Sequence, residues 1–125
     1  MSDEVDASSA PLAGRTVLVV EDEYLLAENL CEGLAAAGAR VLGPIGTVAE
    51  ALAFLEHQDD PPDRVVLDVN LHGERSYPIA DALIRRAIRL VFVTGYGKEA
   101  LDGRYRDFPH CEKPIDERAL ISLLR

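Results

Sequence analysis

The chain has 125 residues, of which 48% are hydrophobic and 28% charged, and its formal net charge is −9. This length suits one domain that buries a core without disulfides or structural metals. The acidity disfavours nucleic acid and anionic lipid, whose phosphates attract Lys and Arg, so we expect no nucleic-acid partner and no membrane association. A cation suits an acidic face better.

Residues 1–13 are predicted to form a flexible N-terminal tail, followed by one domain over residues 14–125. The tail is acidic and rich in small residues, without the basic and apolar regions of a signal peptide. No apolar run is long enough to span a bilayer. Cys31 and Cys111 have no paired spacing, so we expect both to be reduced in a cytoplasmic protein.

Four short apolar runs and one brief polar segment predict five β-strands, and the run RTVLVV, rich in β-branched residues, has the pattern of a strand buried on both faces. In chain order the strands are expected at residues 15–20, 40–43, 64–69, 89–94 and 110–112. Amphipathic segments between them predict helices. These begin at Tyr24, after the capping-box residue Thr47, after Ser76 and after Asp116.

This alternation predicts an α/β fold of five βα units, with a parallel sheet between two layers of helices. The helix between the fourth and fifth strands must be short. Residues 98–109 carry few apolar side chains, and little packing offsets the cost of helix nucleation there. We therefore expect this segment to be the most mobile part of the domain.

Polar residues stand where four of the strands end. Glu21 and Asp22 follow the first strand, and Asp68 lies at the end of the third. Thr94 ends the fourth strand, and Lys113 follows the fifth. The carboxyl ends of parallel strands lie on one edge of the sheet, where open α/β sheets bind their ligands. Four separate segments therefore predict a single site.

The residue types at this edge suit phosphoryl chemistry. Three carboxylates repel one another unless a cation joins them, and hard oxygen donors suit Mg²⁺. A carboxylate can attack phosphorus to form an aspartyl phosphate, while Lys113 and the Thr94 hydroxyl stabilise the phosphoryl oxygens. Each residue alone has a plainer explanation, as a helix cap, a turn residue or a surface lysine. Their convergence favours the joint site.

Four motifs within residues 15–125 resemble the receiver domain of two-component response regulators. They are VLVVEDE, VVLDVNL, FVTGYG and CEKPI. The resemblance implies a flavodoxin-like, doubly wound (βα)5 sheet with strand order 2-1-3-4-5 and a phosphoacceptor at Asp68. FVTGYG also resembles the FATGUY subgroup of single-domain receivers, known from alphaproteobacterial stress signalling.

The same resemblance implies a role for each site residue. The Mg²⁺ ligands would be Asp22 and Asp68 directly, Glu21 mostly through water, and the backbone carbonyl of Asn70. Thr94 and Lys113 would hold the phosphoryl group, and the Lys113–Pro114 peptide bond would be cis. A histidine kinase or a phosphotransfer protein would supply the phosphoryl group, and a downstream protein would read the signal.

The sequence departs from the family pattern in three places. His110 stands where the family has its switch aromatic, so Thr94 and His110 would form the switch; a half-buried strand residue is the other explanation of His110. The loop NLHGERS after Asp68 lacks the common proline, and the span from Thr94 to Lys113 is short. These departures concern the switch rather than phosphorylation.

Two other functions compete with a phosphorylation switch. One is a phosphate-independent interaction module on the same fold. The other is a phosphatase of the haloacid-dehalogenase type, which needs a DxD motif after its first strand, where this chain has Glu21-Asp22-Glu23. We favour the switch, a monomer or weak homodimer that catalyses only its own phosphorylation and dephosphorylation. Its output would be protein contact, or it would serve as a phosphate sink.

Overall fold

A computed structural model describes residues 10–95 and 101–125 of the chain. Its elements are β1 (Thr16–Val20), α1 (Tyr24–Ala36), β2 (Arg40–Ile45), α2 (Val48–His57), β3 (Arg64–Asp68), β4 (Asn70–Leu71), β5 (Glu74–Arg75), α3 (Tyr77–Arg85), β6 (Arg89–Thr94), a 3-10 helix (Gly103–Tyr105), β7 (His110–Glu112) and α4 (Glu117–Leu124). The main sheet is parallel, in the order β2-β1-β3-β6-β7. Because β6 and β7 are its fourth and fifth strands, the predicted flavodoxin-like α/β class and the order 2-1-3-4-5 are confirmed.

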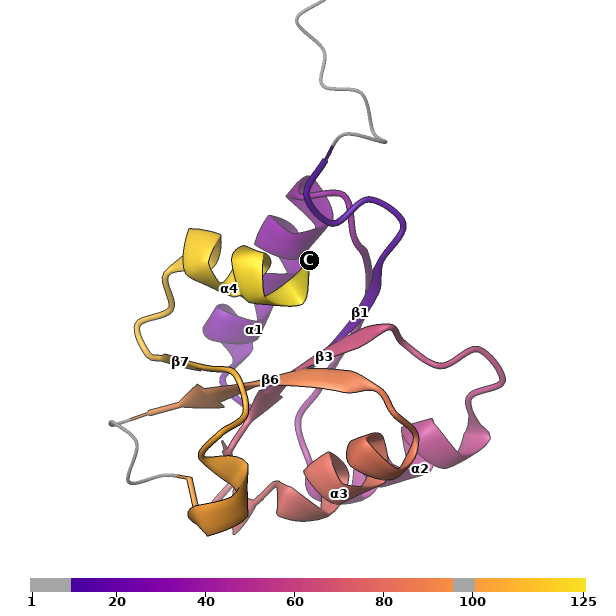
Figure 1. Ribbon diagram of the computed structural model, residues 1–125, viewed down its shortest axis with the longest axis vertical. Coiled ribbons are helices and arrows are strands. Elements are labelled where there is room, and N and C mark those ends of the chain that lie inside the picture. The colour runs from indigo at the N-terminus through magenta and orange to yellow at the C-terminus, as the bar shows by residue number, and fades with distance from the viewer. Residues whose placement is uncertain (1–9, 96–100) are drawn as a thin grey trace, which may run out of the picture.

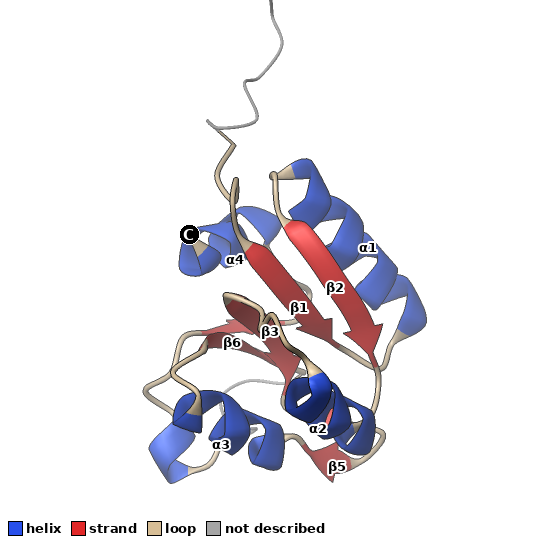
Figure 2. Cartoon of the chain, turned by 90° about the vertical axis from the view of Figure 1, so that its right-hand side faces the viewer, coloured by secondary structure: helices blue, strands red, loops and turns tan. Residues whose placement is uncertain are grey.

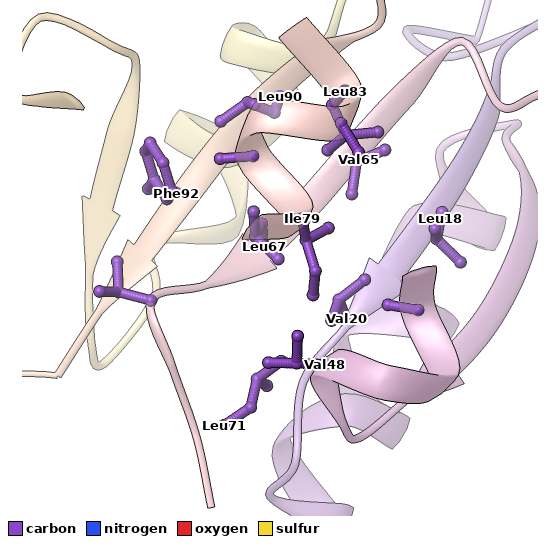
Figure 3. Packing of buried hydrophobic residues seen from close by; sticks show 14 of the residues in the cluster. Leu18, Val20, Val48, Val65, Leu67, Leu71, Ile79, Leu83, Leu90 and Phe92 are labelled. Carbon is purple, nitrogen blue, oxygen red and sulfur yellow. The ribbon is translucent and has the colours of Figure 1, made fainter. Parts of the chain in front are cut away.

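Helices cover both faces of this sheet, with α1 and α4 on one face and α2 and α3 on the other (Figures 1 and 2). Successive side chains of a strand point to opposite faces, so each strand serves both layers. In β1, Val17 and Val19 pack in the layer of α1 and α4, whereas Leu18 and Val20 pack in the layer of α2 and α3. Figure 3 shows the second of these layers. Burial on both faces explains why β1, β3 and β6 are largely apolar runs.

The helix starts agree with the sequence at two places. The Thr47 side chain accepts a hydrogen bond from the backbone N–H of Glu50 at 3.1 Å, so Thr47 caps α2, and its hydroxyl donates to the Glu50 carboxylate at 3.0 Å. Asp116 caps α4 by accepting from the N–H of Arg118. Strand β2 is longer than predicted and reaches Ile45, since a register shift in its pairing with β1 extends the contact.

The loop after Asp68 forms a small antiparallel hairpin that the sequence did not predict. Strands β4 and β5 pair Asn70 with Arg75 and Leu71 with Glu74. His72 and Gly73 form the turn with positive φ angles of 51° and 83°. A two-residue turn of this kind matches the twist of an antiparallel pair, and glycine adopts positive φ without strain. The hairpin places its own side chains beside the carboxyl end of the sheet.

The described part of the predicted N-terminal tail belongs to the folded domain. Leu12 is fully buried in the layer of α1 and α4, and its backbone N–H donates to the carbonyl of Ala37 at 2.9 Å. The boundary predicted at residue 14 is therefore late by a few residues. A single leucine among small residues has no periodicity that would mark it as a core residue. Residues 1–9 lie outside the described part.

The connection from β6 to β7 was predicted to hold only a short helix. Residues 98–100 of that prediction lie outside the described part of the chain. In the rest of the connection, the helix is the single 3-10 turn Gly103–Tyr105. Leu101 and Tyr105 are buried, and the Tyr105 ring stacks on Tyr77 with the ring centres 4.1 Å apart. The described residues therefore pack more apolar surface than the composition suggested.

Candidate functional site

The carboxyl edge of the sheet brings the predicted site residues together. Glu21 and Asp22 follow β1, Asp68 is the last residue of β3, Thr94 is the last residue of β6, and Lys113 follows β7. An open pocket of about 760 Å³ lies at this edge. Its lining includes Asp22, Asp68, Asn70, Arg75, Gly95 and Lys113. The convergence predicted from four segments is thus a feature of the fold.

Glu21, Asp22 and Asp68 form an acidic cluster whose ligand atoms lie within 4.8 Å of one another. Burial raises the pKa of Glu21 to about 8, and the charge of Asp68 adds to this effect. Among the described residues, Glu21 Oε1 is buried and has no hydrogen-bond partner. A buried carboxylate oxygen without a donor, beside two further carboxylates, fits a hard divalent cation such as Mg²⁺.

The ammonium group of Lys113 contacts three carboxylates at the acidic cluster. Its Nζ lies 2.9 Å from Asp68 Oδ2 and 3.3 Å from Glu21 Oε2. The third contact, 2.8 Å long, is to Oε1 of Glu23. Burial alone would lower the pKa of Lys113, but hydrogen bonds to Glu23 and Asp68 outweigh burial and raise it. Lys113 is therefore a fixed positive charge beside the oxygen atoms of Asp68.

Backbone groups hold the two aspartates in place. Asp68 Oδ1 accepts a hydrogen bond from the backbone N–H of Asn70 at 2.9 Å. Asp22 Oδ2 accepts from the backbone N–H of His72 at 2.8 Å, which ties the β4–β5 hairpin to the first strand. Burial acts to raise the pKa of Asp22, but the N–H of His72 and further hydrogen bonds lower it. Asp22 is thus kept ionised, the form in which a carboxylate can bind a cation.

Thr94 and the segment of Lys113 are joined through the backbone. The N–H of Lys113 donates to the carbonyl oxygen of Thr94 at 2.8 Å, and the Lys113–Pro114 peptide bond is cis, as the resemblance implies. The Thr94 side chain is fully buried, and within the described residues its hydroxyl has no hydrogen-bond partner. A buried hydroxyl of this kind can turn toward a new acceptor when one arrives.

His110 is the first residue of the edge strand β7 and is not among the residues that line the pocket. Its side chain is exposed, and its Nδ1 lies 3.3 Å from the carbonyl oxygen of Phe108. The half-buried position that the sequence suggested is therefore wrong, because β7 is the last strand of the sheet. A switch role for His110 stays a prediction.

The sequence did not predict that three further residues take part in the site. Glu23 resembles any acid in the first turn of a helix, yet it contacts Lys113. Arg75 lines the pocket only because the unpredicted hairpin folds back. Ser76 was predicted as a helix cap, but its hydroxyl donates to the carbonyl oxygen of Asp68 at 2.6 Å. A polar loop directly after Asp68 was the available signal for Arg75 and Ser76.

Comparisons with known proteins agree with this geometry, although no family model matches the chain. The solution structure of SdrG from Sphingomonas melonis is 40% identical, with a TM-score of 0.75, over 92% of this chain and 98% of that one. A CheY-like response regulator receiver domain from Methylobacillus flagellatus is 26% identical, with a TM-score of 0.73, over 88% and 95% of the two chains.

The curated relatives agree with these structural matches. The sensory transduction protein LytT of Bacillus subtilis is 31% identical over 112 residues, which are 87% of this chain and 46% of LytT. The chain thus spans about half the length of the curated relatives that it matches. Fold, site and comparisons together show that the chain belongs to the response-regulator receiver domains, the signalling modules of two-component systems. Across the described residues, no helix has the length and apolarity needed to cross a membrane.

Proposed function

We propose that the chain is a phosphorylation-dependent switch that accepts a phosphoryl group on Asp68 in the presence of Mg²⁺. The 2.9 Å contact between Lys113 Nζ and Asp68 Oδ2 carries the proposal, because Asp68 also belongs to the acidic cluster with Glu21 and Asp22. The 40% identity to SdrG, for which a BeF3-activated conformation is known, supports it. The donor is a histidine kinase or a phosphotransfer protein, and the protein acts in the cytoplasm.

In the transfer step, an oxygen of Asp68 attacks phosphorus and forms a new P–O bond. The bond from phosphorus to the donor breaks, and the leaving group takes the electron pair. Asp68 reacts as its carboxylate, so no proton has to leave it. Lys113 moves with the transferred group and donates a hydrogen bond to one phosphoryl oxygen. The buried Thr94 hydroxyl turns to donate to another phosphoryl oxygen. When bound, Mg²⁺ would supply positive charge that offsets the charge developing on the phosphoryl group.

The residues that would hold Mg²⁺ are Asp22 and Asp68 through carboxylate oxygens, Glu21 mostly through water, and Asn70 through its backbone carbonyl. Output is a change in contact with a downstream protein, and the protein is a monomer or a weak homodimer. Beyond its own phosphorylation and dephosphorylation it catalyses no reaction. A phosphate-independent module on the same fold is the alternative.

Phosphate uptake from a small acyl phosphate in the presence of Mg²⁺ separates these two functions. The wild type should be labelled, and Asp68→Asn should not. Asp59→Asn is the matched control, because it removes one exposed carboxylate at a position outside the site and should be labelled like the wild type. An unlabelled wild type would favour the phosphate-independent module.

The route of the signal has its own test at His110. If His110 is the switch residue, phosphorylation should change the surface of β7 and α4 through it. His110→Ala should then keep phosphate uptake but lose the change in the amide NMR signals of Cys111 and Leu120 on addition of beryllofluoride. An unchanged response would assign the signal to another route.

A further inference from the structure

Glu23 occupies an unusual position at the start of α1. It is the N-cap residue, where Ser, Thr, Asp and Asn are preferred because their short side chains accept from the helix N–H groups. Within the described residues, Glu23 makes no such capping bond. Its side chain instead reaches Lys113, 90 positions further along the chain, with 2.8 Å between Oε1 and Nζ. The capping function is replaced by a contact with the site.

The contact uses one of the three N–H donors of Lys113. An ammonium group has three donors, and in this structure they face three carboxylates. The distance to Glu23 is 2.8 Å, shorter than those to Asp68 at 2.9 Å and to Glu21 at 3.3 Å. A phosphoryl oxygen that arrives at Asp68 must compete for one of these donors. Glu23 is therefore a direct competitor of the incoming group.

The backbone of Glu23 is held firmly, although its side chain is 62% exposed. Its N–H donates to Oε2 of Glu21 at 3.0 Å, the same oxygen that Lys113 contacts. The Glu23 carboxylate also lies at the pocket, where a negatively charged phosphoryl donor enters. Both the competition for Lys113 and this charge oppose the arrival of a phosphoryl group.

We propose that Glu23 is a positioning residue that restrains phosphorylation of Asp68 by tethering Lys113. The inference rests on the proposed function and names a regulator of the same site. In the transfer, Asp68 oxygen bonds to phosphorus, the leaving group departs with its electron pair, and Lys113 turns from Glu23 to a phosphoryl oxygen. Release of the Glu23–Lys113 contact thus precedes or accompanies the chemical step.

The first test is the initial rate of phosphorylation by a small acyl phosphate at saturating Mg²⁺. Glu23→Gln should react about two- to fivefold faster than the wild type, the range expected for loss of one exposed ion pair. Glu32→Gln is the matched control, since it removes the same charge from an exposed position on the same helix. Its rate should equal that of the wild type. Equal rates in Glu23→Gln and Glu32→Gln, or a slower Glu23→Gln, would overturn the inference.

Glu23→Asp distinguishes the tether from a simple effect of charge. This variant keeps the negative charge but is shorter by one methylene group, so it loses the contact with Lys113. The tether predicts that Glu23→Asp is phosphorylated as fast as Glu23→Gln. In both variants the maximal rate should exceed that of the wild type. A wild-type rate in Glu23→Asp would refute the tether. A variant with an unchanged maximal rate, whose only change is a lower donor concentration at half-maximal rate, would refute it as well. Absence of labelling in every protein, wild type included, would refute the proposed function itself.

Discussion

The hydroxyl of Ser76 donates a 2.6 Å hydrogen bond to the backbone carbonyl oxygen of Asp68. Ser76 is fully buried and lies directly before α3, so the bond joins the end of β3 to the start of that helix. The backbone N–H of Ser76 also donates to the carbonyl of Val69 at 2.8 Å. The position of Asp68 therefore depends in part on a hydrogen bond to its backbone rather than to its carboxylate.

Ser76→Ala should destabilise the domain by about 1–2 kcal/mol, because a buried carbonyl oxygen loses its donor. Urea denaturation measures the change. Ser122→Ala in α4 is the control, as Ser122 is exposed and its replacement should alter the free energy of unfolding by less than about 0.5 kcal/mol. Equal stability of the two variants would show that the Ser76 bond is compensated.

Tyr105 joins the connection between β6 and β7 to α3 through a ring contact and a hydrogen bond. Its ring stacks on Tyr77, and its hydroxyl donates to Asp81 Oδ1 at 2.7 Å. Tyr105→Ala should cost about 3 kcal/mol of unfolding free energy, whereas Tyr105→Phe should cost only about 1 kcal/mol, since it keeps the ring. Thermal or urea unfolding gives both values. If Tyr105→Ala lost less than about 1 kcal/mol of unfolding free energy, the segment would be loosely packed, as the sequence predicted.

The sequence predicts the centre of the sheet well because β1, β3 and β6 are buried along most of their length. The run Val17 to Val20 has no polar residue, so its boundaries are visible, and the acids that follow it mark the edge of the sheet. The same contrast locates Asp68 and Thr94 at the ends of β3 and β6. Most of the predicted site residues therefore follow from the ends of apolar strands, whereas Lys113 follows a short polar strand.

Features that depend on tertiary contacts were not predictable in this way. The β4–β5 hairpin has two residues in each strand, too few to show alternation. Tyr105 lies in a segment without periodicity, and its burial depends on a partner from α3. Glu23 looks like a surface acid, because nothing near it in the chain indicates a contact with Lys113.

Glu21 should make the stability of the cation-free protein depend on pH. Its pKa in the folded state is raised from 4.5 to about 8, so the folded protein binds more protons than the unfolded chain between these values. The contribution of Glu21 is fully present below about pH 4.5 and is lost as the pH rises through 8. Urea denaturation in a chelator should show this loss in the wild type and a flatter profile in Glu21→Gln. Parallel profiles would contradict the raised pKa.

Mg²⁺ should stabilise the folded protein, because the acidic cluster exists only after folding. At ten times the dissociation constant, the gain in unfolding free energy is about 1.4 kcal/mol. Thermal melts with added Mg²⁺, compared at matched ionic strength with a sodium salt, measure it. Asp22→Asn should remove the gain, while Asp59→Asn should keep it. A wild type whose melting temperature ignores Mg²⁺ would argue against a cation site at this edge.

The most direct measurement locates the phosphoryl group after reaction with an acyl phosphate and Mg²⁺. Borohydride reduction converts an aspartyl phosphate to a stable homoserine, which mass spectrometry of the peptides assigns to one residue. We predict reduction at Asp68 alone in the wild type and in Asp59→Asn, and none in Asp68→Asn. Reduction at another carboxylate, or equal phosphate uptake by Asp68→Asn, would contradict the assignment of Asp68 as the phosphoacceptor.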